Sequence, residues 1–255
     1  MNQQDAKQRF RHDGYVFLQQ FLGETDVAEI RENMTRFIQD VLPSLPVEQV
    51  YYEDPGDPIT LKQIQQLGKH DSYFGHWQNN SAFRELAELL LEGAVIPTNM
   101  QYFNKPPGIG KATPPHQDGF YFMLDPCEAV TLWLALEKVD EENGCVRYIR
   151  GSHCEGMRPH RRTETLGFSQ GIADFPTGDD MAKEVAFPAQ AGDLLAHHAL
   201  TIHRADQNCS QSRTRQAIGL IYYSERAQEN AATAEAYQKK LAKCLTATGK
   251  VIRKA

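Results

Sequence analysis

From about residue 94 onward, short β-forming runs alternate with turn residues, and this alternation is the strongest constraint on how the chain can fold. Glu142-Asn143-Gly144 lies between two of the runs and is typical of a hairpin turn. Several short strands separated by turn signals predict a sandwich or a barrel. The runs span residues 100–103, 120–123, 129–136, 145–149, 194–198 and 217–223.

The region before residue 94 has a mostly helical pattern. We predict helices over residues 3–12, about 25–42 and about 80–91, and a short strand at 15–18. Thr25 or Asp26 can cap the second helix, and Pro43 stops it. Asn80 or Ser81 begins the third helix, and Gly93 ends it.

The simplest architecture is a single domain of the mainly β class, in which flanking helices pack on a double-stranded β-helix (jelly-roll) core. A chain of 255 residues is long enough for one large domain or two small ones. We divide it into a helical N-terminal part and lid (1–93), a jelly-roll core (94–225) and a C-terminal part (226–255). Residues 231–245 in the last part predict a helix.

The charge balance argues against nucleic acid as a partner. The net charge is −6 and the pI is near 5.9, so no basic footprint for a phosphate backbone is present. The densest basic cluster, residues 158–162, also contains a proline and a histidine, and we interpret it as a solvated loop. A local basic patch still leaves anionic substrates possible. No sequence pattern indicates the oligomeric state.

Cysteine usage and the chain termini indicate a cytoplasmic protein. The five cysteines form no Cys-x-x-Cys pair and are odd in number, which favours a reducing compartment. The polar N-terminus lacks the apolar core of a signal peptide, and no apolar run approaches the length of a membrane span. We therefore expect no membrane partner.

The motif that is most informative about function is His116-Gln117-Asp118, followed far downstream by His203. On an extended segment, the side chains of His116 and Asp118 project to the same face. A second imidazole from a distant strand would complete a set of two histidines and one carboxylate, the ligand set of non-haem Fe(II) oxygenases. A lone His-x-Asp is a weak signal, because a surface loop produces it by chance.

Arg215 strengthens the metal hypothesis because it opens the apolar run that leads into residues 217–223. An inward arginine one strand from a metal is costly to bury unless it pairs with an anion. Its guanidinium suits a carboxylate held through two hydrogen bonds. The pattern around Arg215 therefore indicates a carboxylate ligand beside the metal.

These features together resemble the phytanoyl-CoA dioxygenase family of Fe(II)- and 2-oxoglutarate-dependent oxygenases. The similar stretches follow one another in a consistent order over nearly the whole chain, which is more specific than any single motif. They are residues 10–22, residues 104–107 leading to 116–118, residues 133–137 followed by 142–145, residues 151–153, and residues 203–208 leading to 215–217.

The resemblance implies that His116, Asp118 and His203 bind Fe(II), and that Arg215 binds the distal carboxylate of 2-oxoglutarate. The family usually places this arginine eleven positions after the distal histidine, which here is Thr214. Arg215 fits if the loop carries one extra residue, and Arg213 is the alternative.

Three further residues stand at positions close to the family's co-substrate pocket. Trp133 either lines that pocket or packs in the core. Gln101 or Tyr102 either approaches the carboxylate of 2-oxoglutarate next to iron or forms a packing pair between strands. Of the adjacent His197 and His198, only one can face a cavity on a strand, as a substrate contact or a partner of a ligand.

The implied enzyme is a dioxygenase that uses Fe(II), 2-oxoglutarate and O2 to hydroxylate a C–H bond of a small-molecule metabolite, and it releases succinate and CO2. Related halogenases lack the carboxylate ligand, so Asp118 favours hydroxylation. Two alternatives remain open at this point. One is a cupin-like metal enzyme that does not depend on 2-oxoglutarate, and the other is a non-catalytic binding module. Neither residues 47–78 nor 155–185, the two segments expected to cover the pocket, identifies the substrate.

Overall fold

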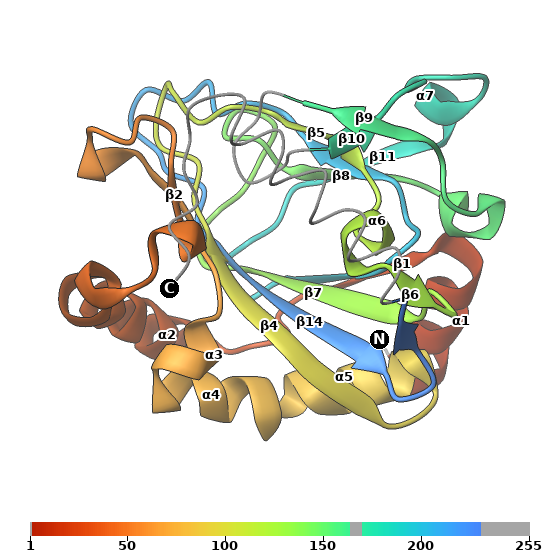
Figure 1. The fold of residues 1–255 in the computed structure, drawn as a ribbon, viewed down its shortest axis with the longest axis horizontal. Helices are drawn as coiled ribbons and strands as arrows, with labels where there is room; N and C mark the ends of the chain where they lie inside the picture. Colours follow the sequence, from red (N-terminus) through yellow and green to blue (C-terminus); the bar gives the residue numbers. More distant parts are fainter. Residues whose placement is uncertain (1, 164–169, 231–255) are drawn as a thin grey trace.

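Two antiparallel β-sheets face each other in the computed structural model, which describes residues 2–163 and 170–230. The larger sheet has seven strands in the order β1-β12-β7-β14-β4-β3-β2, and the smaller has four in the order β11-β8-β13-β5. This arrangement confirms the jelly-roll core (Figure 1). The strands of the larger sheet are β1 (Tyr15–Leu18), β2 (Val50–Tyr52), β3 (Leu61–Ile64), β4 (Val95–Phe103), β7 (Ala129–Ala135), β12 (Leu194–His198) and β14 (Ala217–Ser224).

The smaller sheet brings together segments that are far apart in the chain. Its strands are β5 (Thr113–His116), β8 (Val146–Ile149), β11 (Glu184–Phe187) and β13 (His203–Ala205). Two short ribbons flank the core, one of β9 (His160–Arg162) with β10 (Gln170–Ile172) and one of β6 (Leu124–Asp125) with β15 (Gln228–Glu229). Because β1, β2 and β3 join the larger sheet, the N-terminal part contributes to the core as well as covering it.

Helices cover the face of the larger sheet that points away from the smaller one (Figure 1). They bury a continuous apolar core in which Phe37, Phe74 and Phe83 are almost fully enclosed. The α-helices are α1 (Gln3–Asp13), α2 (Glu24–Arg36), α3 (Leu67–His70), α4 (Ser72–Asn79), α5 (Ala82–Leu91), α6 (Gly119–Phe122) and α7 (Asp180–Lys183). A π-helical turn spans Phe37–Val41, and 3-10 turns span Leu42–Ser44, Val47–Gln49, Pro58–Thr60 and Ser152–Glu155. Within the described ranges, none of the helices has the length and apolarity that a membrane span requires.

Several predicted elements match, and one is wrong. The Ser81 side chain accepts a hydrogen bond from the Phe83 N–H at the start of α5, as the capping pattern predicts. The predicted strand at 120–123 is instead the short helix α6, because the chain turns at Gly119. A Cβ atom at Gly119 would lie 2.5 Å from Cys127 Sγ, so the close packing requires glycine there. The predicted helix over 231–245 lies outside the described residues.

The second predicted helix also differs from its expected form. It begins at Glu24, so neither Thr25 nor Asp26 caps it, and Gly23 precedes it without a side-chain cap. Beyond Arg36 it widens into the π-helical turn, and the 3-10 turn that contains Pro43 follows. A proline is tolerated there because its position near the start of a helical turn needs no backbone donor.

The aromatic side chains of residues 47–78 pack mainly on the core. Phe74 is fully buried, and Tyr73 and Trp77 pack against the same cluster. The basic cluster at 158–162 is less solvated than predicted, since Arg158 forms ion pairs with Asp174 and Asp180 at 2.9 Å. These pairs neutralise Arg158 and tie the covering segment together, so Arg158 is a poor candidate for an anionic substrate.

Gly144 is required by its backbone geometry, and its replacement should destabilise the fold. Its φ is +87°, and a Cβ atom there would lie 2.4 Å from the carbonyl oxygen of Asp206. We expect Gly144→Ala to lower the free energy of unfolding by about 2 kcal/mol or more. Gly151 has a similar φ of +75° but nothing within 4 Å of its Cβ position. In urea unfolding, Gly151→Ala should therefore cost clearly less, and equal losses for the two variants would contradict the role of the Asp206 contact.

His198 should make stability depend on pH. Burial, with a smaller contribution from His153, lowers the pKa of His198 to about 4, and its Nδ1 accepts a hydrogen bond from the Leu200 N–H. The unfolded histidine keeps a pKa of about 6.5, so the stabilisation is present above pH 6.5 and is lost as the pH falls through 4. Urea unfolding should show a loss of about 3 kcal/mol over this window. His198→Phe should reduce that loss, and an unchanged slope in the variant would contradict the assignment.

Candidate functional site

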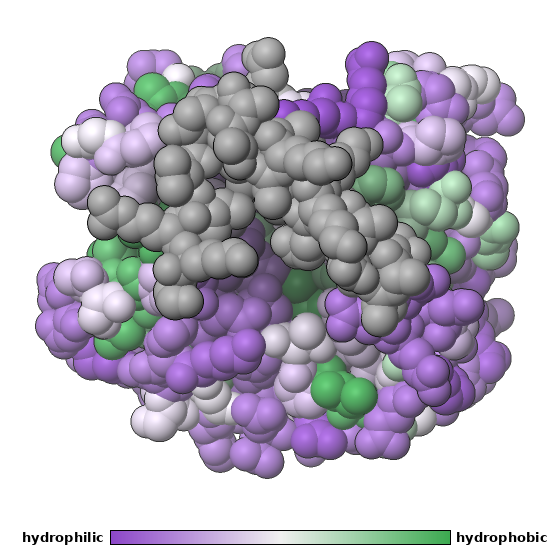
Figure 2. Space-filling view, in the orientation of Figure 1, coloured by the Kyte–Doolittle hydropathy of each residue, from purple (hydrophilic) through white to green (hydrophobic). Residues whose placement is uncertain are grey.

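A cavity of about 360 Å³ opens between the two sheets. The face drawn in Figure 2 is mostly hydrophilic where described residues are visible, with hydrophobic side chains set back near its centre. One end of the cavity contains His116, Asp118 and His203, and Arg215 lines it as well. The core of the fold therefore encloses all four residues that the sequence singles out most strongly.

His116 and His203 lie directly opposite each other on neighbouring strands of the smaller sheet, β5 and β13. His116 Nδ1 donates to the Pro114 carbonyl at 2.8 Å, and His203 Nδ1 donates to the Thr201 carbonyl at 3.0 Å. A carbonyl oxygen can only accept, so each ring carries its proton on Nδ1. Both Nε2 atoms therefore point a lone pair toward the same space.

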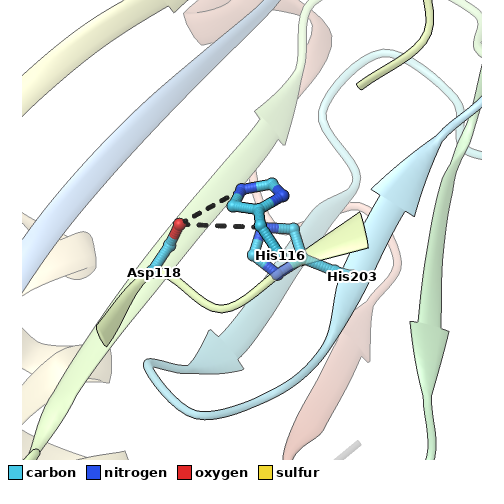
Figure 3. A group of neighbouring side chains, drawn as sticks. All are labelled: His116, Asp118 and His203. Carbon is cyan, nitrogen blue, oxygen red and sulfur yellow. Dashed lines mark ion pairs between the residues drawn. The ribbon is translucent and has the colours of Figure 1, made fainter. Parts of the chain in front are cut away.

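Asp118 completes the group from the turn after β5. Its Oδ1 lies 3.5 Å from His116 Nε2 and 3.7 Å from His203 Nε2, and the carboxylate points toward both rings (Figure 3). The expected extended segment from His116 to Asp118 is wrong in detail, because Asp118 has helical dihedral angles at the start of α6. The turn nevertheless delivers the carboxylate to the same space.

The protonation states of the group suit a divalent cation. Burial and the neighbouring His116 and His197 hold the pKa of His203 well below its usual value, so this imidazole is neutral at pH 7. Burial opposes ionisation of Asp118, but its position among His203, His116 and His197 holds its pKa well below the usual range. Neutral imidazole and ionised carboxylate are the forms that bind metals.

The donor set fits iron. The three donor atoms lie within 4.8 Å of one another, so one ion can reach all of them. Two imidazole nitrogens and one carboxylate oxygen form the facial ligand set that leaves positions open for a co-substrate and dioxygen. The backbone carbonyls of Pro114 and Thr201 orient the two rings in the way that outer partners commonly orient metal-binding histidines.

Arg215 lies in the cavity as a buried cation. Only 5% of its surface is exposed, and its Nε has no hydrogen-bond partner among the described residues. Its guanidinium carbon lies 5.5 Å from the centre of the Trp133 ring, which also lines the cavity. Burial lowers the pKa of Arg215 to about 10, so it stays charged at pH 7. A buried charge without an ion partner is expensive unless a ligand supplies the anion.

Two lysines line the cavity together with Arg215, and the sequence did not single out their roles. The backbone of Lys105 exchanges two hydrogen bonds with that of Arg215, each 3.1 Å long. Lys105 Nζ donates to the Lys111 and Asp206 carbonyls, and Lys62 Nζ lies 3.1 Å from Glu53 Oε1. Lys105 belongs to the Asn-Lys-Pro-Pro stretch of the family resemblance, whereas Lys62 lies in a short polar strand that gave no signal.

The remaining candidates separate by their position on the strands. Arg213 lies outside the cavity lining, where it pairs with Asp140 and Glu142. Gln101 lines the cavity and accepts a hydrogen bond from Gln63 at 2.6 Å. Tyr102 instead packs in the apolar core, because neighbouring residues on β4 face opposite sides, so of its two expected roles the structure supports packing between strands.

The same alternation separates His197 from His198 on β12. His197 faces the cavity, whereas His198 lies on the helical side, near Phe10. Asn208 fixes a turn by donating to the Lys105 and Arg213 carbonyls, in agreement with its sequence context. Two residues beside the site were missed: Thr131, which lies on the same face of β7 as Trp133, and Tyr148 on β8.

Comparison with known proteins assigns the chain to a family. The family model described as phytanoyl-CoA dioxygenase matches residues 10–217. The chain belongs to the phytanoyl-CoA dioxygenase family. It is therefore a non-haem iron, 2-oxoglutarate-dependent oxygenase. A phytanoyl-CoA dioxygenase of Arabidopsis thaliana is 27% identical over 245 residues, which cover 83% of this chain and 85% of the relative.

Solved structures share the fold. EvdO2 from Micromonospora carbonacea var. aurantiaca is 26% identical with a TM-score of 0.70, covering 89% of this chain and 92% of that one. The epimerase SnoN, solved with Fe3+, alpha ketoglutarate and nogalamycin RO, has a TM-score of 0.73 at 22% identity, covering 92% and 88%. At that identity, SnoN supports the fold alone.

Proposed function

We propose that His116, Asp118 and His203 bind Fe(II), and that Arg215 binds the distal carboxylate of 2-oxoglutarate in a hydroxylase of small molecules. The observation that carries the proposal is the convergence of three metal-binding atoms within 4.8 Å in the same cavity as a buried guanidinium that forms no ion pair with a described carboxylate. The two features fit one ligand, because a metal and a guanidinium can bind the two carboxylates of a single dicarboxylic acid.

The cavity selects its co-substrate by charge and by shape. Arg215 stays charged, and Lys62 and Lys105 line the same cavity, which favours an anion over a neutral molecule. Trp133 packs against the guanidinium and limits its rotation, so the charge is fixed in place. Gln101, anchored by Gln63, is placed to donate to a carboxylate oxygen of the co-substrate.

The remaining cavity wall is suited to a polar, uncharged part of the substrate. Part of this wall presents amide, hydroxyl, aromatic and aliphatic side chains, namely Gln65, Gln66, Thr98, Asn99, Tyr121, Phe122, Ile221 and Tyr223, whereas the charged Lys111 and Arg204 line another part. The Tyr121 hydroxyl bonds to the backbone of Gln170 and so connects the wall to β10. A small-molecule substrate placed here would present a C–H bond to the metal end of the cavity.

An Fe(II) ion held by these residues would supply, together with dioxygen and 2-oxoglutarate, the oxidation that converts a substrate C–H bond to C–OH while 2-oxoglutarate becomes succinate and CO2. The protein orients the reactants and excludes water. Arg215 would hold the co-substrate from one side, and His116 and His203 would hold the metal on the other. Asp118 occupies the position that chloride takes in related halogenases, which favours hydroxylation.

The alternatives are weaker. A cupin-like enzyme that does not depend on 2-oxoglutarate would not need Arg215 buried in the cavity. A non-catalytic module would not need three metal-binding side chains whose donor atoms lie within 4.8 Å of one another. A cytoplasmic location without a nucleic-acid or membrane partner remains part of the proposal, and so does the organisation of residues 1–255 as one catalytic domain. Named relatives include peroxisomal enzymes, so fractionation of cells is the test of location.

Loss of the carboxylate ligand should abolish turnover. We expect Asp118→Ala to lower 2-oxoglutarate-dependent succinate formation by at least about 100-fold, because the metal loses an anionic ligand. Succinate is measured with purified protein, Fe(II) and 2-oxoglutarate. Asp40→Ala, at an exposed carboxylate on the outer helical layer, is the matched control and should keep wild-type turnover. Full turnover in Asp118→Ala would refute the ligand assignment.

Arg215 and Arg213 should differ sharply in their effect on 2-oxoglutarate. Arg215→Gln removes the buried cation, so the co-substrate concentration for half-maximal turnover should rise about 30-fold or more. Arg213→Gln removes only a partly exposed ion pair and should leave that concentration within about twofold. A larger effect from Arg213→Gln would transfer the role to Arg213. Thermal unfolding of both variants checks that each is folded.

A further inference from the structure

The second carboxylate oxygen of Asp118 is occupied by two protein donors. Thr131 Oγ1 donates to Asp118 Oδ2 at 2.6 Å, and His197 Nε2 donates to the same oxygen at 3.1 Å. Thr131 and His197 are direct partners across strands β7 and β12 of the larger sheet. One pair of neighbouring strands therefore presents both donors to one oxygen, while Oδ1 alone faces His116 and His203.

Tyr148 fixes the orientation of His197. Its hydroxyl lies 2.9 Å from His197 Nδ1. Because a carboxylate can only accept, His197 carries its proton on Nε2, and Nδ1 accepts from the tyrosine O–H. The chain of hydrogen bonds thus runs from Tyr148 through His197 to Asp118. Tyr148 lies opposite His203 on β8 of the smaller sheet, so this chain also bridges the two sheets.

The three supporting side chains have little freedom to move. Tyr148 is fully buried, and His197 and Thr131 are 3% and 6% exposed. The ring of Tyr148 stacks on that of Tyr15 with centroids 4.8 Å apart and an angle of 16°. Packed side chains with satisfied polar groups hold their geometry more tightly than solvated ones. The position of Asp118 Oδ2 is therefore set by the core on both sides of the cavity.

We propose that Tyr148, His197 and Thr131 are positioning residues that retain Asp118 Oδ2, so that Asp118 binds the metal through Oδ1 alone. The inference rests on the proposed metal site. A carboxylate whose second oxygen is free can turn and bind through both oxygens. That mode would use a coordination position required by 2-oxoglutarate or dioxygen. Because protein donors hold Oδ2, this coordination position on the metal stays available.

Binding of Co(II) to the purified protein tests the role without any need for turnover. Its ligand-field absorption bands respond to the number and arrangement of ligands, and titration gives its affinity. His197→Phe keeps the ring volume but removes both nitrogens, so we expect about 10-fold weaker Co(II) binding and altered bands. His197→Gln can donate its amide N–H to Oδ2 and accept from Tyr148, and should restore affinity to within about threefold of wild type.

Two more variants separate this role from a general effect on folding. Thr131→Val removes the other donor while keeping the side-chain shape, and should also weaken Co(II) binding and alter the bands. His198→Phe, at the next residue of β12 but on the opposite face, is the matched control and should bind Co(II) as wild type does. Thermal unfolding without metal identifies any variant that is not folded. If His197→Phe does not fold, the Co(II) binding of Thr131→Val tests the role.

The outcomes distinguish this inference from the proposed function. If wild-type protein binds no Co(II), the metal site itself is wrong, and the positioning role is overturned with it. If wild type binds Co(II) but folded His197→Phe and Thr131→Val bind equally well with unchanged bands, only the positioning role is overturned. Weaker binding and altered bands in both variants, with recovery in His197→Gln, would support it.

Discussion

The hydrogen bonding of one carboxylate governs the interior of this fold. Asp118 is the point where the two sheets, α6 and the cavity meet, and both of its oxygens face groups that can donate a hydrogen bond or hold a metal with it. An ionised carboxylate in such a place costs several kcal/mol unless its lone pairs are satisfied. The structure satisfies one oxygen with protein donors and leaves the other for the space between His116 and His203. Stability and function are therefore coupled at a single side chain.

The two sheets fix the positions of the site residues more precisely than loops alone would. His116 and His203 are direct partners on adjacent strands, and Thr131 and His197 are direct partners on two others. Register in an antiparallel pair fixes which side chains share a face, and a shift by one residue would reverse all of them. The geometry of the site is thus a consequence of strand register, which the buried apolar faces of both sheets enforce.

Sequence reasoning found the parts of the site that local rules control. Strand alternation correctly separated His197 from His198, and the family resemblance gave the fold and the enzyme class. It failed where distant packing matters: residues 120–123 look like a strand but form α6, which begins at Gly119, where a Cβ atom would collide with Cys127. Lys62 could not be found, because its place in the cavity depends on β3 joining a sheet of distant strands.

The distribution of charge connects the cofactor end of the cavity to the stability of the whole domain. Arg215, Lys105 and Lys62 are buried together, and of the three only Lys62 lies in an ion pair with a described carboxylate, that of Glu53. Burial and the nearby Arg215 hold the pKa of Lys105 well below its usual value. A dianion bound here would supply the missing negative charge and relieve this repulsion. Since such a ligand binds only the folded chain, co-substrate binding and folding favour each other. If Arg215 binds 2-oxoglutarate as proposed, the same buried groups that repel one another would favour a dicarboxylate in this cavity.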